Sequence, residues 1–166
     1  SKRRDPVSIQ EFEKQGYLPQ ALCNWLVRIG WSHGDDEIFS KDDIVRLFDL
    51  SGIGRSSAQA DTGKLDWLNQ HYIKSLPDGD LLTALDPFLV RLTGSPAPRS
   101  PAFTRLVGLL RERSQTLEEM AEKARFAVID EITMEAKAVG KHLKPACLPI
   151  LESLNEQLQQ LDTWDA

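Results

Sequence analysis

The chain has 166 residues, which is enough for one compact domain or two small ones. Its hydrophobic content of 41% is too high for an unfolded tail. Lysine and arginine together number 20 against 25 acidic residues, giving a net charge of -5. This balance argues against a general coat for DNA or membranes, although a local basic patch could still bind one structured polyanion.

Compartment and topology follow from what the sequence lacks. Cys23 and Cys147 are too few for a disulfide scaffold or a zinc cage, and they indicate a reducing compartment. No apolar run approaches the length of a membrane span, and no charged-then-apolar leader opens the chain. We therefore expect a cytoplasmic protein without a membrane partner. Because the chain begins at Ser1 and its first methionine is Met120, we also expect it to have been cut from a longer protein.

Four helical segments are predicted in the first half of the chain, each from a capping residue or proline and a following end signal. They extend from Ser8 to Gly16, from Pro19 to Gly30, from Ser40 to Phe48 and from Asp61 to Pro77. The third carries Ile44, Val45, Leu47 and Phe48 on one apolar side. Residues 51–60 hold two glycines and three serines and are predicted to form a loop.

The second half continues the helical pattern. Leucines recur from Leu81 to Leu92, and we expect Asp86-Pro87 to cap and restart this helix. Residues 93–101 form a linker, followed by a helix from Phe103 to Leu110 and two more that begin at Thr116 and Thr133; the second reaches toward Leu143. A leucine stripe over residues 148–161 is interpreted as the core face of a bundle, with a dimer seam as the alternative. The predicted fold is all-α, with two small helical units joined near residue 77.

The residues alone supply no complete active site. The three histidines, His33, His71 and His142, are scattered, and none has a second ligand at metal-binding spacing, so we expect no metal site. The glycines of residues 51–55 follow no strand and are too few for a phosphate-binding loop.

A series of short motifs carries a family resemblance. Ser1-Lys2-Arg3 resembles the end of the signature loop of class I aminoacyl-tRNA synthetases. The text that follows is similar, in order and spacing, to bacterial glutamyl-tRNA synthetases. The matching motifs are Gly16-Tyr17-Leu18-Pro19, Asn24-Trp25-Leu26, Gly30-Trp31-Ser32, Glu37-Ile38-Phe39, Lys64-Leu65, Trp67-Leu68-Asn69 and His71-Tyr72-Ile73. After residue 74 the resemblance is looser and rests on Arg113, Thr116-Leu117, Ala124-Arg125 and His142-Leu143.

The resemblance implies a division of labour. Residues 1–76 would be the end of the signature loop and the stem-contact domain, and residues 77–166 the first anticodon-binding helical domain. The full-length parent would ligate glutamate to its tRNA with ATP and Mg²⁺. This chain would lack the catalytic domain, would be inactive alone, and would bind no cofactor by itself. Its expected partners are the tRNA for glutamate and the missing catalytic domain of the same chain, and we expect a monomer.

The resemblance also implies site residues. Lys2 and Arg3 would be catalytic, with Lys2 near the ATP phosphates. Ser32, Lys64 and Trp67 are candidates for the inner corner of the tRNA, although Trp67 could equally be a packed aromatic.

Arg113 matches the position that reads the third anticodon base in discriminating enzymes. The alternative is a purely structural role, in which a cation near a helix C-terminus complements the helix dipole. This role accounts for the neighbouring Arg111. We expect Arg105, Arg111 and Arg113 to form a local positive surface near the rim of the core.

A second function from another class stays open at this point. A free-standing helical adaptor could bind RNA or protein and catalyse nothing. A start codon near Ser1 in the gene would favour the adaptor, whereas an upstream reading frame that encodes a nucleotide-binding domain would favour the synthetase. A DNA-binding helix-turn-helix is disfavoured by the net charge of -5.

Overall fold

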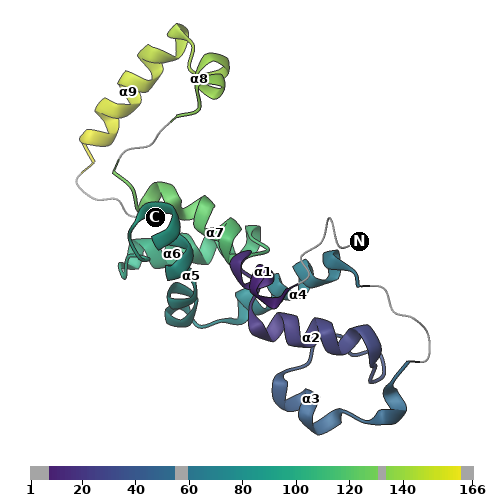
Figure 1. Cartoon of the computed structure of the whole chain (residues 1–166). Helices are drawn as coiled ribbons and strands as arrows, with labels where there is room; N and C mark the ends of the chain where they lie inside the picture. The colour runs from purple at the N-terminus through teal and green to yellow at the C-terminus, as the bar shows by residue number, and fades with distance from the viewer. Residues whose placement is uncertain (1–7, 55–59, 131–133, 162–166) are drawn as a thin grey trace. The chain divides into compact units, whose positions relative to one another are not determined.

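The computed structural model describes residues 8–54, 60–130 and 134–161. The chain divides into two compact units, residues 1–130 (the first unit) and residues 131–166 (the second unit). Within the described ranges there are nine α-helices and no β-strand, which confirms the all-α prediction (Figure 1). No helix in these ranges is both long and apolar enough to cross a membrane.

Seven of the α-helices lie in the described part of the first unit. They are α1 (Ile9–Lys14), α2 (Pro19–Gly30), α3 (Lys41–Leu47), α4 (Thr62–Ser75), α5 (Asp78–Thr93), α6 (Pro101–Leu110) and α7 (Leu117–Ala124). Short 3-10 turns follow several of them: η1 (Leu50–Gly52), η2 (Arg111–Arg113) and η3 (Arg125–Ala127). The predicted N-caps are confirmed, because the side chains of Ser8, Ser40, Asp61 and Thr116 each accept a backbone N–H from the first turn of their helix.

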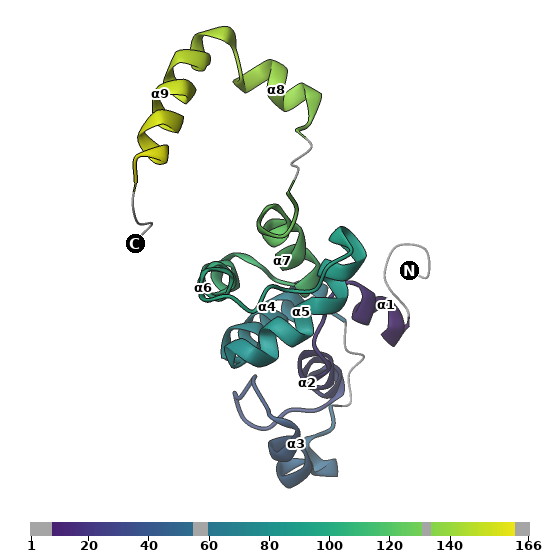
Figure 2. The same cartoon turned by 90° about the vertical axis from the view of Figure 1, so that its left-hand side faces the viewer.

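One hydrophobic core runs through the first unit. Its buried side chains come from both sides of Leu76-Pro77, from Phe12 and Trp25 to Phe103 and Met120. Helix α2 packs on α4, and α5 packs on α7. Figures 1 and 2 both show α3 at the end of the unit that lies away from α7. Of the leucines predicted for α5, Leu81, Leu82, Leu85 and Leu89 are buried, whereas Leu92 near the end of the helix is only partly buried.

The expectation that Asp86-Pro87 restarts the helix is wrong. Helix α5 continues through Pro87 without a break. Proline cannot donate to the carbonyl of Thr83, but Thr83 is exposed, so water can satisfy that carbonyl. The Asp86 carboxylate instead accepts the N–H of Ala97 at 2.8 Å and pairs with Arg99 at 2.6 Å. Asp86 therefore holds the linker of residues 94–100 against α5 rather than capping a new helix.

The apolar side predicted for α3 is only partly buried. Ile44 and Leu47 are half-buried, whereas Val45 is 75% exposed and Phe48, which follows the last turn, is 48% exposed. The helix has only two turns, and its main helical neighbour in the described residues is α2. A helix this short buries only a narrow stripe against its main neighbour and leaves the flanking apolar side chains partly in water.

Two buried asparagines fix the loops around α4. Asn24 donates to the carbonyl of Glu37 at 2.9 Å and accepts from the N–H of Phe39 at 2.7 Å. Asn69 accepts from the N–H of Leu18 at 2.8 Å and donates to the carbonyls of Gly16 and Gln115. Both side chains are fully buried, so these bonds satisfy backbone groups that water cannot reach.

The second unit contains α8 (Ala136–His142), the turn η4 (Pro145–Cys147) and α9 (Leu148–Gln159). Thr133 lies outside the described residues, and the helix predicted to begin there begins at Ala136, with Glu135 as its N-cap.

The leucine stripe of α9 is mostly exposed within the second unit, and its interpretation as a bundle core face stays a prediction. The exposed members of the stripe are Leu148, Leu151, Leu154 and Leu161. The physical reason for this exposure is size, because two short helices offer too little surface to enclose a stripe.

Candidate nucleic-acid interface

The exposed face of α4 carries a row of one cation and two aromatic rings. The Nζ of Lys64 lies 4.2 Å from the ring centroid of Trp67, and Trp67 is 42% exposed. The ring of His71 stacks on Trp67 with centroids 6.3 Å apart. Spacings of three and four residues place these side chains on one side of the helix. A cation over an exposed aromatic plane suits both a phosphate and a stacked base or sugar.

Lys64 is also paired with Glu37, at 2.5 Å from Nζ to Oε2. The hydrogen bond from Lys64 holds the pKa of the Glu37 carboxyl below its ordinary value. A phosphate that binds Lys64 therefore competes with a carboxylate that is already in place.

Ser32 lies on the loop that follows α2. Its N–H donates to the carbonyl of Gly52 at 3.1 Å, and its side chain is exposed. The indole N–H of the neighbouring Trp31 donates to the carbonyl of Asp49. Gly52 lies directly against this indole, where an added Cβ would be 2.6 Å from Nε1, so no larger residue fits. These contacts with Asp49 and Gly52 fix the backbone of the loop, while the Ser32 side chain faces solvent.

Arg113 occupies the last position of η2. Its side chain is exposed, and among the described residues its guanidinium has no hydrogen-bond or ion-pair partner. Its carbonyl accepts a hydrogen bond from Lys123, which fixes the backbone at this position. Leu106 and Leu109 line a shallow pocket of about 470 Å³ beside it, and Leu109 is 72% exposed. The arrangement places the planar guanidinium of Arg113, with its N–H donors unpaired among the described residues, next to the exposed apolar side chain of Leu109.

Arg111 differs from Arg113 although only one residue separates them. Its side chain is 16% exposed, and it donates to the carbonyls of Lys74 and Leu76 and pairs with Asp78. The expected positive surface of three arginines is therefore reduced to Arg105 and Arg113. Arg111 does meet a helix C-terminus, but that of α4 and not that of its own helix.

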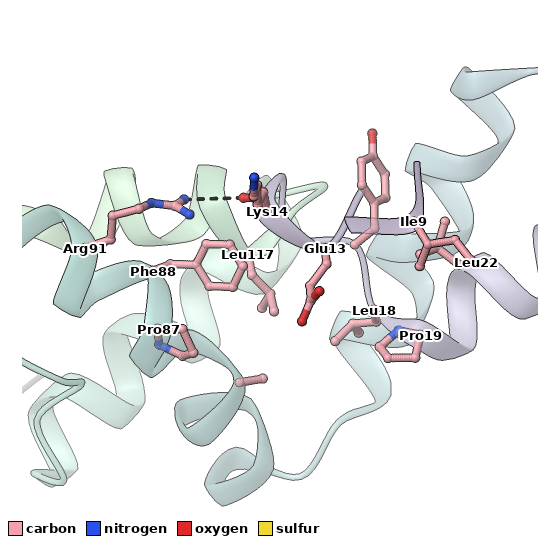
Figure 3. Close-up of a pocket in the computed structure, with 12 residues that line it drawn as sticks. Ile9, Glu13, Lys14, Leu18, Pro19, Leu22, Pro87, Phe88, Arg91 and Leu117 are labelled. Atoms are coloured by element: carbon pink, nitrogen blue, oxygen red, sulfur yellow. Dashed lines mark hydrogen bonds between the residues drawn. The ribbon is translucent and has the colours of Figure 1, made fainter. Parts of the chain in front are cut away.

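A further hollow in the first unit contains none of the predicted site residues. It has a volume of about 580 Å³ and lies between α1, the start of α2, α5 and α7 (Figure 3). Its walls are mostly apolar, and Leu18, Phe88 and Leu117 are among them. Arg91 at its edge donates to the carbonyl of Lys14 and pairs with Glu118. Glu13 and Lys14 also line the hollow, and neither of them is among the residues that the sequence predicted for the site.

The structure thus brings Lys64 and Trp67 together, whereas Ser32 and Arg113 lie elsewhere. Lys64 is near the start of α4, and η2 contacts the end of the same helix through the pair of Lys74 with Glu112. Lys2 and Arg3 lie outside the described residues. Sequence reasoning missed His71 as a member of the row on α4, although its position four residues after Trp67 carried the signal.

Two family models match the chain in tandem. The model described as "tRNA synthetases class I (E and Q), catalytic domain" matches residues 1–67, and the model described as "Anticodon binding domain" matches residues 80–166. The chain belongs to the class I glutamyl-tRNA synthetase family. The family resemblance of the motifs is thereby confirmed. The boundary at residues 76 and 77 falls between the two matched ranges and stays a prediction.

Relatives of known name support the same family. The chain is 44% identical over 158 residues to a glutamate–tRNA ligase of Geobacter sulfurreducens, covering 95% of this chain and 34% of the relative. It is 46% identical over 164 residues to glutamate–tRNA ligase 1 of Syntrophus aciditrophicus, covering 99% of this chain and 34% of the relative. The chain therefore spans about a third of the length of the curated relatives it matches.

Solved structures agree in fold. A glutamate tRNA ligase of Elizabethkingia meningosepticum superposes with a TM-score of 0.74 at 25% identity, covering 91% of this chain and 30% of that one. A glutamate-tRNA synthetase of Elizabethkingia anophelis gives a TM-score of 0.68 at 24% identity, covering 91% of this chain and 29% of that one.

Proposed function

We propose that this chain is the tRNA-binding portion of a glutamate–tRNA ligase, which attaches glutamate to its tRNA at the expense of ATP. The observation that carries the proposal is the identity of 44% to 46% with ligases of that name over nearly the whole chain. In this proposal residues 1–76 contact the inner corner of the tRNA and residues 77–166 contact the anticodon. Apart from the contribution proposed below for Lys2 and Arg3, the chemistry belongs to the rest of the protein, and this chain positions the tRNA for it.

Arg113 is proposed to read the third anticodon base. Glutamate anticodons end in C, whose O2 and N3 are two adjacent acceptors for a planar guanidinium. Glutamine anticodons end in G, whose corresponding edge presents N–H donors, so donors would face donors. The exposure of Arg113 and the lack of a partner for it among the described residues support this role. The neighbouring Leu109 gives the base an apolar surface to lie on.

The decisive experiment uses the full-length protein and two tRNAs that differ only in the third anticodon base. Arg113→Gln should reduce the preference for C over G by about 1–3 kcal/mol, the range for a bidentate base contact. Arg105→Gln is the matched control, because Arg105 is an exposed arginine on α6 without a partner among the described residues. Equal charging of both tRNAs by the parent, or an unchanged preference in the variant, would exclude Arg113 as the reader.

Lys64 and Trp67 are proposed to hold the sugar-phosphate backbone at the inner corner, with Ser32 as a further polar contact. Lys64→Ala should weaken tRNA binding and lower the slope of log affinity against log salt by about one. Lys41→Ala serves as control, because Lys41 is exposed and has no partner among the described residues. Removing the competing carboxylate by Glu37→Gln should strengthen binding. Unchanged affinity and salt slope in Lys64→Ala would refute the contact.

Lys2 and Arg3 keep their proposed role at the ATP phosphates. Pyrophosphate gains negative charge as it leaves, and an ammonium placed beside it stabilises that charge more in the transition state than in the ground state. Lys2→Ala in the full-length protein should slow glutamyl-adenylate formation by about 100-fold, the effect of one lost electrostatic donor. An unchanged rate of pyrophosphate exchange would remove Lys2 from the active site.

A further inference from the structure

The side chain of Arg111 bridges the end of α4 and the start of α5. One terminal nitrogen donates to the carbonyls of Lys74 at 3.1 Å and Leu76 at 2.8 Å, and the other pairs with the carboxylate of Asp78. These acceptors lie on both sides of Leu76-Pro77, the joint between α4 and α5. A guanidinium is suited to this task because its donors are held in one plane and at fixed angles.

Further side chains of α4 contact the same short stretch of chain. Lys74 pairs with Glu112 at 2.5 Å, and Gln70 donates to the Glu112 carbonyl at 3.2 Å. The buried Asn69 donates to the carbonyl of Gln115 at 2.6 Å. Residues 111–115 are therefore attached to α4 at several points, and Arg111 is the member of this set that also contacts α5.

The two proposed tRNA surfaces lie on either side of this attachment. Lys64 and Trp67 are on α4, and ten residues of helix between Lys64 and Lys74 span roughly 15 Å. Arg113 is in the same turn as Arg111 but faces solvent. Two surfaces can bind one rigid tRNA together only if the distance between them is fixed.

We propose that Arg111 is a positioning residue, which sets the location of the anticodon reader Arg113 relative to the tRNA surface of α4. The inference rests on the proposed function and adds a residue that need not touch tRNA at all. Its exposure of 16% and its three acceptors within the protein leave it little capacity for an external ligand.

The functional test measures charging of the C-ending and G-ending tRNAs by the full-length protein. Arg111→Gln should lower kcat/KM for the C-ending tRNA by about tenfold, since misplacement by about an ångström can cost up to about 100-fold. Arg111→Lys should recover only part of this, because an ammonium can pair with Asp78 but cannot also supply the planar fork. The matched control is Arg91→Gln, which removes an arginine that reaches from α5 to the Lys14 carbonyl at 3.4 Å, away from η2. It should change kcat/KM less than about twofold, as expected for exposed contacts.

A second measurement reports position without activity. Spin labels at Val45→Cys and Ala102→Cys, with Cys23→Ser and Cys147→Ser, place one probe on each side of the joint at exposed sites. We expect a narrow distance distribution in the full-length parent and a broader one in Arg111→Gln. If Arg111→Gln does not fold, Asp78→Ala replaces it, because that change removes one acceptor of Arg111 at a side chain that is 63% exposed.

The outcomes separate the two proposals. An unchanged distance distribution, or unchanged charging in the folded variants, would overturn the positioning role. If the parent charged neither tRNA, the proposed function would fail, and the distance distributions would still decide whether Arg111 fixes the joint.

Discussion

Leucines at helical spacing have opposite fates in the two units. In α5 of the first unit, Leu81, Leu85 and Leu89 are fully buried. In α9 of the second unit, Leu151 and Leu154 are 47% and 48% exposed. The periodicity is equally regular in both, so it predicts the helix and its apolar side but not the burial of that side. Burial depends on the neighbouring helices: α6 and α7 pack on α5 in the first unit, whereas the described part of the second unit offers α9 only the short helix α8 and the turn η4.

Truncating one leucine in each unit should give the largest contrast. Leu85→Ala is expected to lower the free energy of unfolding by about 2–5 kcal/mol, because it removes buried methyl groups and leaves a cavity. Leu154→Ala should change it by less than about 0.5 kcal/mol, as for other surface substitutions. Urea unfolding of the chain, followed by tryptophan fluorescence, measures both. A loss above about 2 kcal/mol for Leu154→Ala would show that the α9 stripe is packed in solution.

Removing the buried amide of Asn69 should have the next largest effect. Asn69→Ala leaves the N–H of Leu18 and the carbonyls of Gly16 and Gln115 without their partner in the interior. Each unsatisfied buried group costs about 1–3 kcal/mol, and relaxation recovers part of the sum, so we expect a loss of about 3 kcal/mol. Gln70→Ala, which removes one exposed bond to Glu112, should cost less than about 1 kcal/mol. Equal losses for the two variants would contradict the structure.

Many features of the fold could be predicted from the sequence, and there is a physical reason for those that could not be. The caps at Ser40 and Thr116 were predictable because a cap is a local contact between residues a few positions apart. The roles of Asn69 and Arg111 were not predictable, because their partners are far away in the chain. The predicted helix start at Asp86 was wrong for the same reason. Asp-Pro is a local start signal, but the Asp86 carboxylate instead accepts hydrogen bonds from the more distant Ala97 and Arg99.

In the candidate site, too, local contacts could be predicted from the sequence and distant ones could not. The pairing of Lys64 with Trp67 follows from helical spacing, and the structure places the cation over the ring as that spacing suggests. Glu37 as a competing partner of Lys64 comes from a distant loop, and no local pattern announces it.

A smaller effect is expected from Asp86 as the pH falls. Its hydrogen bonds with Arg99 and with the N–H of Ala97 hold the pKa of this carboxyl below its ordinary value in the folded chain. The stabilisation is therefore complete above the unfolded pKa of about 3.9 and is lost as the pH falls through the lower folded value. Asp86→Asn should cost about 1–2 kcal/mol at pH 7, in the range of a charged hydrogen bond, and progressively less below pH of about 4.

The control for this pH dependence is Asp35→Asn, since Asp35 is an exposed loop residue with no partner among the described residues. It should leave the acid limb of the stability curve unchanged. If the difference between the parent and Asp86→Asn were constant from pH 7 to pH 2, the carboxylate would not be the source of the stabilisation.

The smallest effect, and the one of opposite sign, is expected at Ser114. This residue is fully buried directly after η2, and its hydroxyl has no hydrogen-bond partner among the described residues. Burying a hydroxyl without a partner costs about 1–3 kcal/mol on scales derived from proteins, and alanine fits the same space without that cost. Ser114→Ala should therefore leave the free energy of unfolding unchanged or raise it by up to about 1 kcal/mol. Urea unfolding alongside Leu85→Ala makes the test direct, because both changes remove a few atoms from the same unit. A loss of more than about 1 kcal/mol would mean that the hydroxyl has a partner, such as a buried water, and that the segment carrying Arg111 and Arg113 is held more firmly than its protein contacts indicate.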